Sequence, residues 1–133
     1  MTMNNEPFPK AGDILNYIFL FAHEAETRDE GIKERPCVVV EVIPEQKRVR
    51  VAPLTTKGER YTDALPVPED VAQKANLVHP TAVVVSETNI FTWLGYDLRP
   101  LHRTNSIYVG RLTPKFTHKV MDLVRNAKSI DRD

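Results

Sequence analysis

The segment from Arg35 to Leu54 restricts the fold of this chain more than any other part of the sequence. Its first half, RPCVVVEVI, is rich in β-branched residues, and its proline lacks an N–H and so belongs at the start of a strand or on a sheet edge. The PEQK that follows predicts a tight turn, because the ring of Pro44 presets the φ angle that such a turn needs. RVRVAPL predicts a second strand, with Val49 and Val51 on one face. We therefore expect an antiparallel hairpin.

The expected hairpin brings the start of its first strand close to the end of its second strand. Arg35 and Pro36 are then near Leu54 and Thr55 in space. A guanidinium group is always charged and presents a planar fork of donors that matches phosphate oxygens, and a threonine hydroxyl can donate to the same group. Cleavage of a phosphodiester needs charge stabilisation, an oriented 2′-hydroxyl and proton transfer, and requires no metal. The competing interpretation is an ordinary surface arginine at a strand start.

The rest of the sequence predicts further short strands and one long helix. Strands are expected at residues 12–21, 64–67 and 107–112, and residues 81–93 predict one long strand or a pair broken near SETN. Residues 22–34 predict a long polar loop, and PEDVAQKA predicts a helix of two turns with its proline in the first position. Together these elements favour a small, strongly bent antiparallel barrel.

The helix expected at residues 113–128 has clear signals at its start. Thr113 can cap it and Pro114 fits the first helical position. Helical spacing places five apolar residues on one stripe, and that stripe must cover a sheet; the residues are Phe116, Val120, Leu123, Val124 and Ala127. With 133 residues, the chain is expected to form a single domain, 1–133.

Several classes of site have no support in the sequence. A Gly-rich phosphate loop, a Cys pair and a His-x-x-x-His motif are all missing, so we expect neither a nucleotide cofactor nor a zinc site. The single cysteine, Cys37, stands in a valine run and is expected to be a small buried apolar residue. Formal net charge is zero, but residues 22–34 carry five acids against two bases, whereas residues 99–128 carry seven bases against one acid. A basic face could attract a polyanion, although a solvated helix face explains much of it.

The N-terminal residues and the apolar runs bear on location. MTMNNEPFPK does not have the basic start and apolar core of a secretory signal. The longest nearly apolar run, ILNYIFLFA, contains Asn16 and is too short to span a bilayer. We expect a cytoplasmic protein without a membrane partner.

Four motifs follow one another in an order that resembles the MazF/PemK family of toxin endoribonucleases, to which Kid is related. GDIL opens a strand, EGIKERP leads into CVVVEV, VRVAPLTT ends a strand, and VGRLTPKFTHKVMDLV lies near the C-terminus. The family has Gly-Asp-Ile/Val at a strand start and a Glu five residues before an Arg-Pro. It also has a strand ending in Pro-Ile/Leu-Thr-Ser/Thr, and Gly-x-Leu-Ser/Thr before the final helix. The resemblance spans about residues 11–125.

The resemblance implies a fold, an activity and partners. The fold is an SH3-like (MazF/CcdB-type) antiparallel barrel with a C-terminal helix, assembled as a homodimer. The activity is metal-independent, sequence-selective cleavage of single-stranded RNA without a cofactor, and a cognate antitoxin protein inhibits it. Arg35 matches the catalytic arginine and Thr55 the catalytic threonine, with Thr56 at the neighbouring Ser/Thr position and Glu30 at the loop glutamate. In these roles Arg35 stabilises the phosphorane charge and Thr55 holds a phosphate oxygen.

The chain departs from the family pattern in SETNIFTW, residues 86–93. Relatives often have Asp-Gln and a supporting arginine in this stretch, and Glu87 is the candidate acidic substitute here. Trp93 could stack on bases, although a core or dimer-interface role is the competing interpretation. The residues expected to contact RNA are Arg50, Lys57, Asn89 and Trp93.

Three functional hypotheses stay open on the sequence. The first is an endoribonuclease toxin of a type II toxin–antitoxin pair. The second is a toxin-like barrel that binds RNA or a peptide without catalysis, and the third is a toxin that poisons a protein such as a DNA gyrase. The proton-transfer group is also open, with His23, Glu24, Glu30 and Glu87 as candidates.

Overall fold

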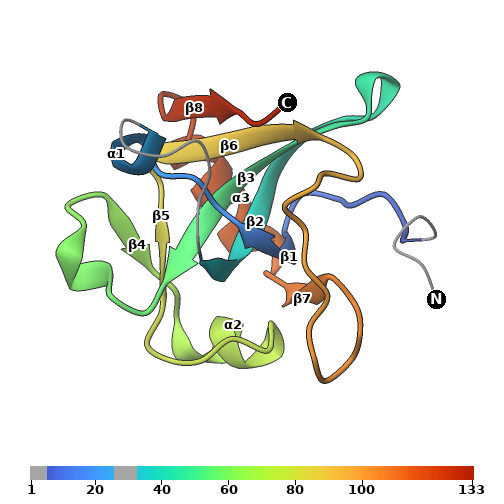
Figure 1. Cartoon of the computed structure of the whole chain (residues 1–133). Helices are drawn as coiled ribbons and strands as arrows, with labels where there is room; N and C mark the ends of the chain where they lie inside the picture. Colours follow the sequence, from blue (N-terminus) through green and yellow to red (C-terminus); the bar gives the residue numbers. More distant parts are fainter. Residues whose placement is uncertain (1–5, 26–32) are drawn as a thin grey trace.

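The computed structural model describes residues 6–25 and 33–133, and it describes only the backbone of Glu24 and Ala25. The first half of the chain forms β1 (Asp13–Ile18), α1 (Ala22–Ala25), β2 (Glu34–Ile43), the 3₁₀ turn η2 (Pro44–Gln46), β3 (Arg48–Thr55), the 3₁₀ turn η3 (Gly58–Arg60) and β4 (Ala64–Pro66). The second half forms α2 (Glu69–Lys74), β5 (Ala82–Val84), β6 (Glu87–Thr92), β7 (Tyr108–Arg111), α3 (Pro114–Leu123) and β8 (Lys128–Asp131) (Figure 1).

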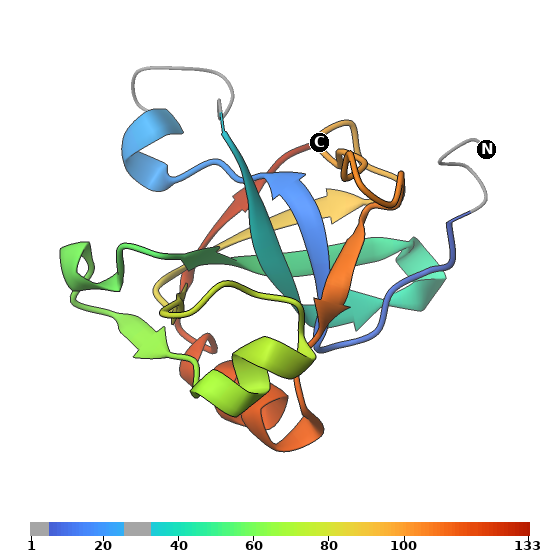
Figure 2. The ribbon, with the colours of Figure 1, turned by 90° about the horizontal axis from the view of Figure 1, so that it is seen from below.

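The described strands form one mainly antiparallel, eight-stranded sheet in the order β4-β5-β3-β2-β1-β7, with β6 beside β3 and β8 beside β6. The long strand β3 organises this sheet. One edge of β3 pairs with β2, whereas the other edge pairs first with β6 and then, at Leu54 and Thr55, with β5. Because β5 and β6 share one edge of β3, the sheet curves around its core, as Figure 2 shows from below. The prediction of a mainly β antiparallel fold is confirmed.

The predicted hairpin is formed by β2, η2 and β3. Its turn ends at Lys47, which has a left-handed φ of 55°, and its pairs run from Ile43↔Arg48 to Cys37↔Pro53. A register shift between Val39 and Glu41 bends the hairpin. The pairing holds Pro36 at the beginning of β2, where a missing N–H costs least.

Helix α3 covers one of two apolar cores. The Thr113 side chain accepts a hydrogen bond from the Phe116 N–H (3.4 Å), and Pro114 occupies the first turn, so the predicted cap is confirmed. Phe116, Val120 and Val124 are buried against β2 and β3, but Leu123 is 48% exposed, so its place on the buried stripe was wrong. Thr117 is buried instead, which shows that the inward face is rotated away from Leu123.

The remaining elements partly agree with the sequence expectations. Residues 81–93 form the strand pair that the sequence allowed, with the break just before Glu87, whereas the polar loop begins with the short helix α1. The C-terminal helix stops at Leu123, and residues 128–131 form β8, an unpredicted strand parallel to β6. Arg48 fixes this strand through ion pairs with Asp131 (2.8 Å) and Asp133 (3.0 Å). Of the helices in the described ranges, none has the length and apolar character to cross a membrane.

Candidate functional site

A pocket of about 460 Å³ opens where β2 begins and β3 ends. Arg35 and Pro36 line it from β2, and Leu54, Thr55 and Thr56 line it from β3 and the turn beyond. The last pair between the two strands is Cys37↔Pro53, and Arg35 and Thr55 each stand two residues beyond it on their own strand. The structure therefore brings together the arginine and the threonine pair that the sequence predicted would share one rim.

The Arg35 side chain rests on an aromatic ring. Its guanidinium carbon lies 4.9 Å from the centroid of the Phe21 ring, a cation–π contact worth about 0.5–2 kcal/mol. The Nε atom of Arg35 is buried and has no hydrogen-bond partner, and none of the ion pairs in the described residues involves this arginine. A half-buried cation with an unused donor is a strong attractor for an oxyanion.

Thr55 is held at the end of β3 by two hydrogen bonds. Its carbonyl accepts from the Thr81 hydroxyl (3.2 Å), and its own Oγ1 accepts from the Lys57 N–H (3.0 Å). A hydroxyl has one proton and two lone pairs, so accepting from Lys57 leaves the proton of Thr55 for another acceptor. Because the residue lines the pocket, that acceptor can be a ligand oxygen.

The charges around the pocket favour an anion. Besides Arg35, its wall includes Lys33, Lys57 and Arg60, and all three of these side chains are exposed. The acidic wall residue is Glu34, whose carboxylate accepts from the Asn16 amide (2.8 Å). Four cations against one hydrogen-bonded carboxylate give the described wall a positive potential, which attracts a phosphate backbone.

Aromatic rings gather beside the arginine, and the sequence analysis missed most of them. Phe21 stacks with Tyr61, with centroids 5.8 Å apart and planes at 23°, and with His23 at 5.6 Å and 27°. Tyr61 lines the pocket, whereas His23 is exposed and does not line it. Tyr61 and Arg60 belong to the segment TKGERYTD, which the sequence presented only as a polar loop. The available signal was a tyrosine five residues after Thr56.

Of the remaining predicted catalytic residues, Glu87 does not line this pocket. Glu30 lies outside the described residues. Glu87 stands at the start of β6, where its Oε1 accepts from the Ala22 N–H (2.7 Å) and so holds the beginning of α1.

Among the predicted RNA contacts, only Lys57 lines the pocket. Arg50 pairs with Glu41 (2.8 Å) and lines a different groove, between the β2–β3 hairpin and α3. Asn89 is fully buried, and its amide bonds to both the N–H and the carbonyl of Leu20, so the prediction that it contacts RNA was wrong.

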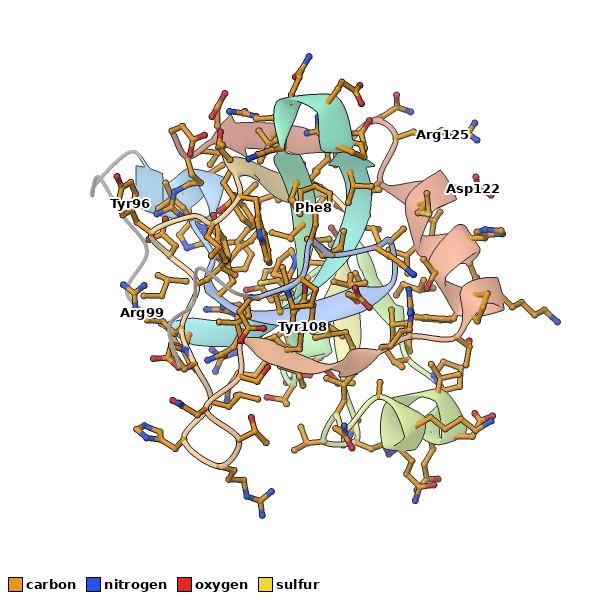
Figure 3. The ribbon with its side chains drawn as sticks, turned by 90° about the vertical axis from the view of Figure 1, so that its right-hand side faces the viewer. Phe8, Tyr96, Arg99, Tyr108, Asp122 and Arg125 are labelled. Atoms are coloured by element: carbon orange, nitrogen blue, oxygen red, sulfur yellow. The ribbon has the colours of Figure 1, made fainter. Side chains whose placement is uncertain are left out.

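Trp93 lies in a separate aromatic group away from the pocket. Its ring packs edge to face on Phe8, with centroids 5.8 Å apart, and lies 6.5 Å from the Tyr108 ring. Figure 3 shows Phe8 and Tyr108 on one face of the molecule. Trp93 is half-buried there, as the competing interpretation expected, and does not flank Arg35.

Cys37 belongs to the core rather than to the chemistry of the site. Its side chain is fully buried, and desolvation raises the pKa of the thiol far above its usual range. Its Sγ donates to the carbonyl of Arg35 (3.5 Å). A protonated, inaccessible thiol is a poor nucleophile, which confirms the expected structural role.

Comparison of the chain with protein-family models and with curated proteins found no match. The chemistry of the site therefore has to be argued from the pocket itself.

Proposed function

We propose that this chain is a metal-independent endoribonuclease that cleaves single-stranded RNA at selected sequences and acts as a cytoplasmic toxin neutralised by a cognate antitoxin. The observation that carries the proposal is the placement of Arg35 and Thr55 on adjacent strands at the wall of one cationic pocket. A guanidinium and a hydroxyl on one pocket wall can donate to the two non-bridging oxygens of one phosphate. A surface arginine without this role would more commonly pair with a carboxylate.

The proposed reaction uses the 2′-hydroxyl of RNA as its nucleophile. A P–O bond forms to the 2′-oxygen and the P–O bond to the 5′-oxygen breaks, which leaves a 2′,3′-cyclic phosphate and a 5′-hydroxyl. One group takes the 2′-proton and another delivers a proton to the leaving oxygen. Arg35 stabilises the charge on the phosphorane and the Thr55 hydroxyl donates to a phosphate oxygen. His23, which is exposed beside Phe21, is the proton-transfer candidate that the described site supports best.

The proposal includes a barrel architecture and a homodimer. The curved sheet, the central β2–β3 hairpin and the packing of α3 over one core support an SH3-like (MazF/CcdB-type) barrel. The exposed large apolar residues in the described chain are Val78, Tyr96 and Leu123, which lie on two loops and on α3. Since they are scattered, the half-buried group of Phe8, Trp93 and Tyr108 is the better candidate for a dimer contact.

An assay of purified protein on mixed RNA in EDTA tests this proposal against its alternatives. If the protein is the proposed nuclease, the wild type gives discrete fragments with 5′-hydroxyl ends, and the Arg35→Ala variant gives no fragments. A toxin-like binding module gives no fragments, yet retains the same RNA in a filter-binding assay. A gyrase poison arrests growth even as Arg35→Ala and inhibits DNA supercoiling while RNA stays intact.

A further inference from the structure

The backbone on both sides of Phe21 is held by side chains of β6. The Asn89 Oδ1 accepts from the Leu20 N–H (2.8 Å) and its Nδ2 donates to the Leu20 carbonyl (2.9 Å). Glu87, two residues earlier and so on the same face of β6, accepts from the Ala22 N–H (2.7 Å). Leu20 and Ala22 follow the end of β1, and these three bonds satisfy backbone groups of both residues.

A buried ion pair holds Asn89 in place. Arg132 donates to the Asn89 Oδ1 (3.2 Å) and to the carbonyl of Ile18 (3.0 Å), and it pairs with Asp97 at 3.0 Å. Its side chain is only 6% exposed, so this arrangement is shielded from solvent. The Asn89 amide is therefore fixed from both the β1 side and the C-terminal side.

Phe21 lies between Leu20 and Ala22, the two residues held by β6, and its ring contacts the guanidinium of Arg35. Phe21 is buried, with a ring that also contacts Phe19 at 4.9 Å, and its π-face supports the guanidinium of Arg35 at 4.9 Å. A shift of the backbone at residues 20–22 would move this ring, and the arginine would lose its support. Misplacement of a catalytic group by about 1 Å can reduce a rate about 100-fold.

We propose that Glu87 and Asn89 are positioning residues, which seat the Phe21 ring beneath Arg35 and so preorganise the guanidinium for an RNA phosphate. This inference rests on the proposed function for its catalytic consequence. It gives Glu87, first considered for acid–base chemistry, a role that depends on accepting one hydrogen bond. A glutamine in its place keeps that acceptor, whereas an alanine removes it.

The kinetic test compares Glu87→Ala with Glu87→Gln, and uses Glu45→Ala in the exposed η2 turn as the matched control. On a short RNA we expect Glu87→Ala to lower kcat about 10- to 100-fold with less than about a twofold change in KM, because the arginine acts on charge that develops in the transition state. Glu87→Gln and Glu45→Ala should stay within about twofold of the wild type. Loss of activity in Glu87→Gln would identify a proton-transfer role, and full activity in Glu87→Ala would remove any role; either result overturns the inference.

A spectroscopic test is independent of cleavage. In a ¹H–¹⁵N spectrum, the Arg35 Nε–H signal should be displaced by the ring current of Phe21, and Phe21→Leu gives the position without the ring. Glu87→Ala should move this signal toward the Phe21→Leu position, and Glu87→Gln and Glu45→Ala should leave it unmoved. If the Glu87→Ala signal stays in place, the positioning role is wrong whatever the activity. If the signals behave as expected but the wild type cleaves no RNA, the positioning stands and the nuclease proposal fails.

Discussion

Arg35 and Thr55 line one pocket at the open end of the β2–β3 hairpin, each two residues beyond the Cys37↔Pro53 pair on its own strand. Side chains two residues apart on a strand point to the same face, so Arg35 shares the face of Cys37, which packs in the core that also contains Phe21. This relationship explains how one charged side chain lies against an aromatic core and still reaches the pocket. Both residues belong to strands of the hairpin, β2 and β3, rather than to a loop.

Substitutions of Thr55 test the role of its hydroxyl, because they leave its backbone carbonyl in place to accept from Thr81. Thr55→Val removes the donor to phosphate and the acceptor of the Lys57 N–H, so we expect cleavage to slow about 10- to 100-fold. Thr55→Ser keeps the hydroxyl and should recover most of the rate. Initial rates on one short RNA measure both, with exposed Thr62→Val as the control. Equal rates for Thr55→Val and the wild type would exclude a hydroxyl contact to the phosphate.

The exposed cations of the pocket should set the salt dependence of RNA binding. Each phosphate neutralised on a single strand contributes a slope of about −0.7 in log K against log salt. If Lys57 and Arg60 each contact a phosphate, the double alanine variant should have a slope less steep by about 1.4. Fluorescence anisotropy at several salt concentrations measures it. Lys119 on α3 and Arg125 just beyond its end do not line the pocket, so their double alanine variant should keep the wild-type slope. A less steep slope in that variant instead would place the RNA beside α3.

The buried thiol predicts how stability depends on pH. Burial raises the pKa of Cys37, so above about pH 8.5 the unfolded thiol ionises while the folded thiol keeps its proton. The unfolded state then binds fewer protons, and the free energy of unfolding should fall by about 1.4 kcal/mol per pH unit from this group. Urea titrations between about pH 8.5 and pH 10 measure the slope. Cys37→Ala should be less stable at every pH but have a flatter slope, and an unchanged slope would contradict the assignment.

Asn89 should contribute strongly to the free energy of unfolding through its hydrogen bonds to Leu20. Asn89→Ala leaves the Leu20 N–H and carbonyl buried without these partners, which we expect to lower the free energy of unfolding by about 2–5 kcal/mol. Urea denaturation measures this loss. The exposed Asn126, which has no left-handed φ, provides a control whose alanine variant should differ little from the wild type. A stable Asn89→Ala protein would show that the amide is dispensable to the fold.

The sequence predicted the parts of the fold that local chemistry decides. Strand propensity and the Pro44 turn predicted the hairpin, and the Thr113–Pro114 pair predicted the start of α3. By contrast, KSID at β8 is short, polar and without alternation; it becomes a strand only because β6 offers an edge and Arg48 binds Asp131. Such tertiary partners leave no local signal.

The residues of the site also fall into those that could be predicted from the sequence and those that could not. Arg35 and Thr55 could be paired from the sequence because a two-strand register relates them. Phe21 and Tyr61 could not, since their stacking depends on how residues beyond β1 and β3 fold back over the sheet. Asn89 stands in a polar stretch that suggested exposure, yet β6 points it inward to hold Leu20.

Cleavage of matched RNA and 2′-deoxy oligonucleotides in EDTA by the wild type and by Arg35→Lys tests the central claim most directly. The wild type should cut the RNA and leave the 2′-deoxy strand whole. Arg35→Lys, which keeps the charge but loses the planar fork, should cut at least about 100-fold more slowly while unfolding at a similar urea concentration. A folded wild type that leaves the RNA intact, or an Arg35→Lys protein that cuts it equally fast, would contradict this account.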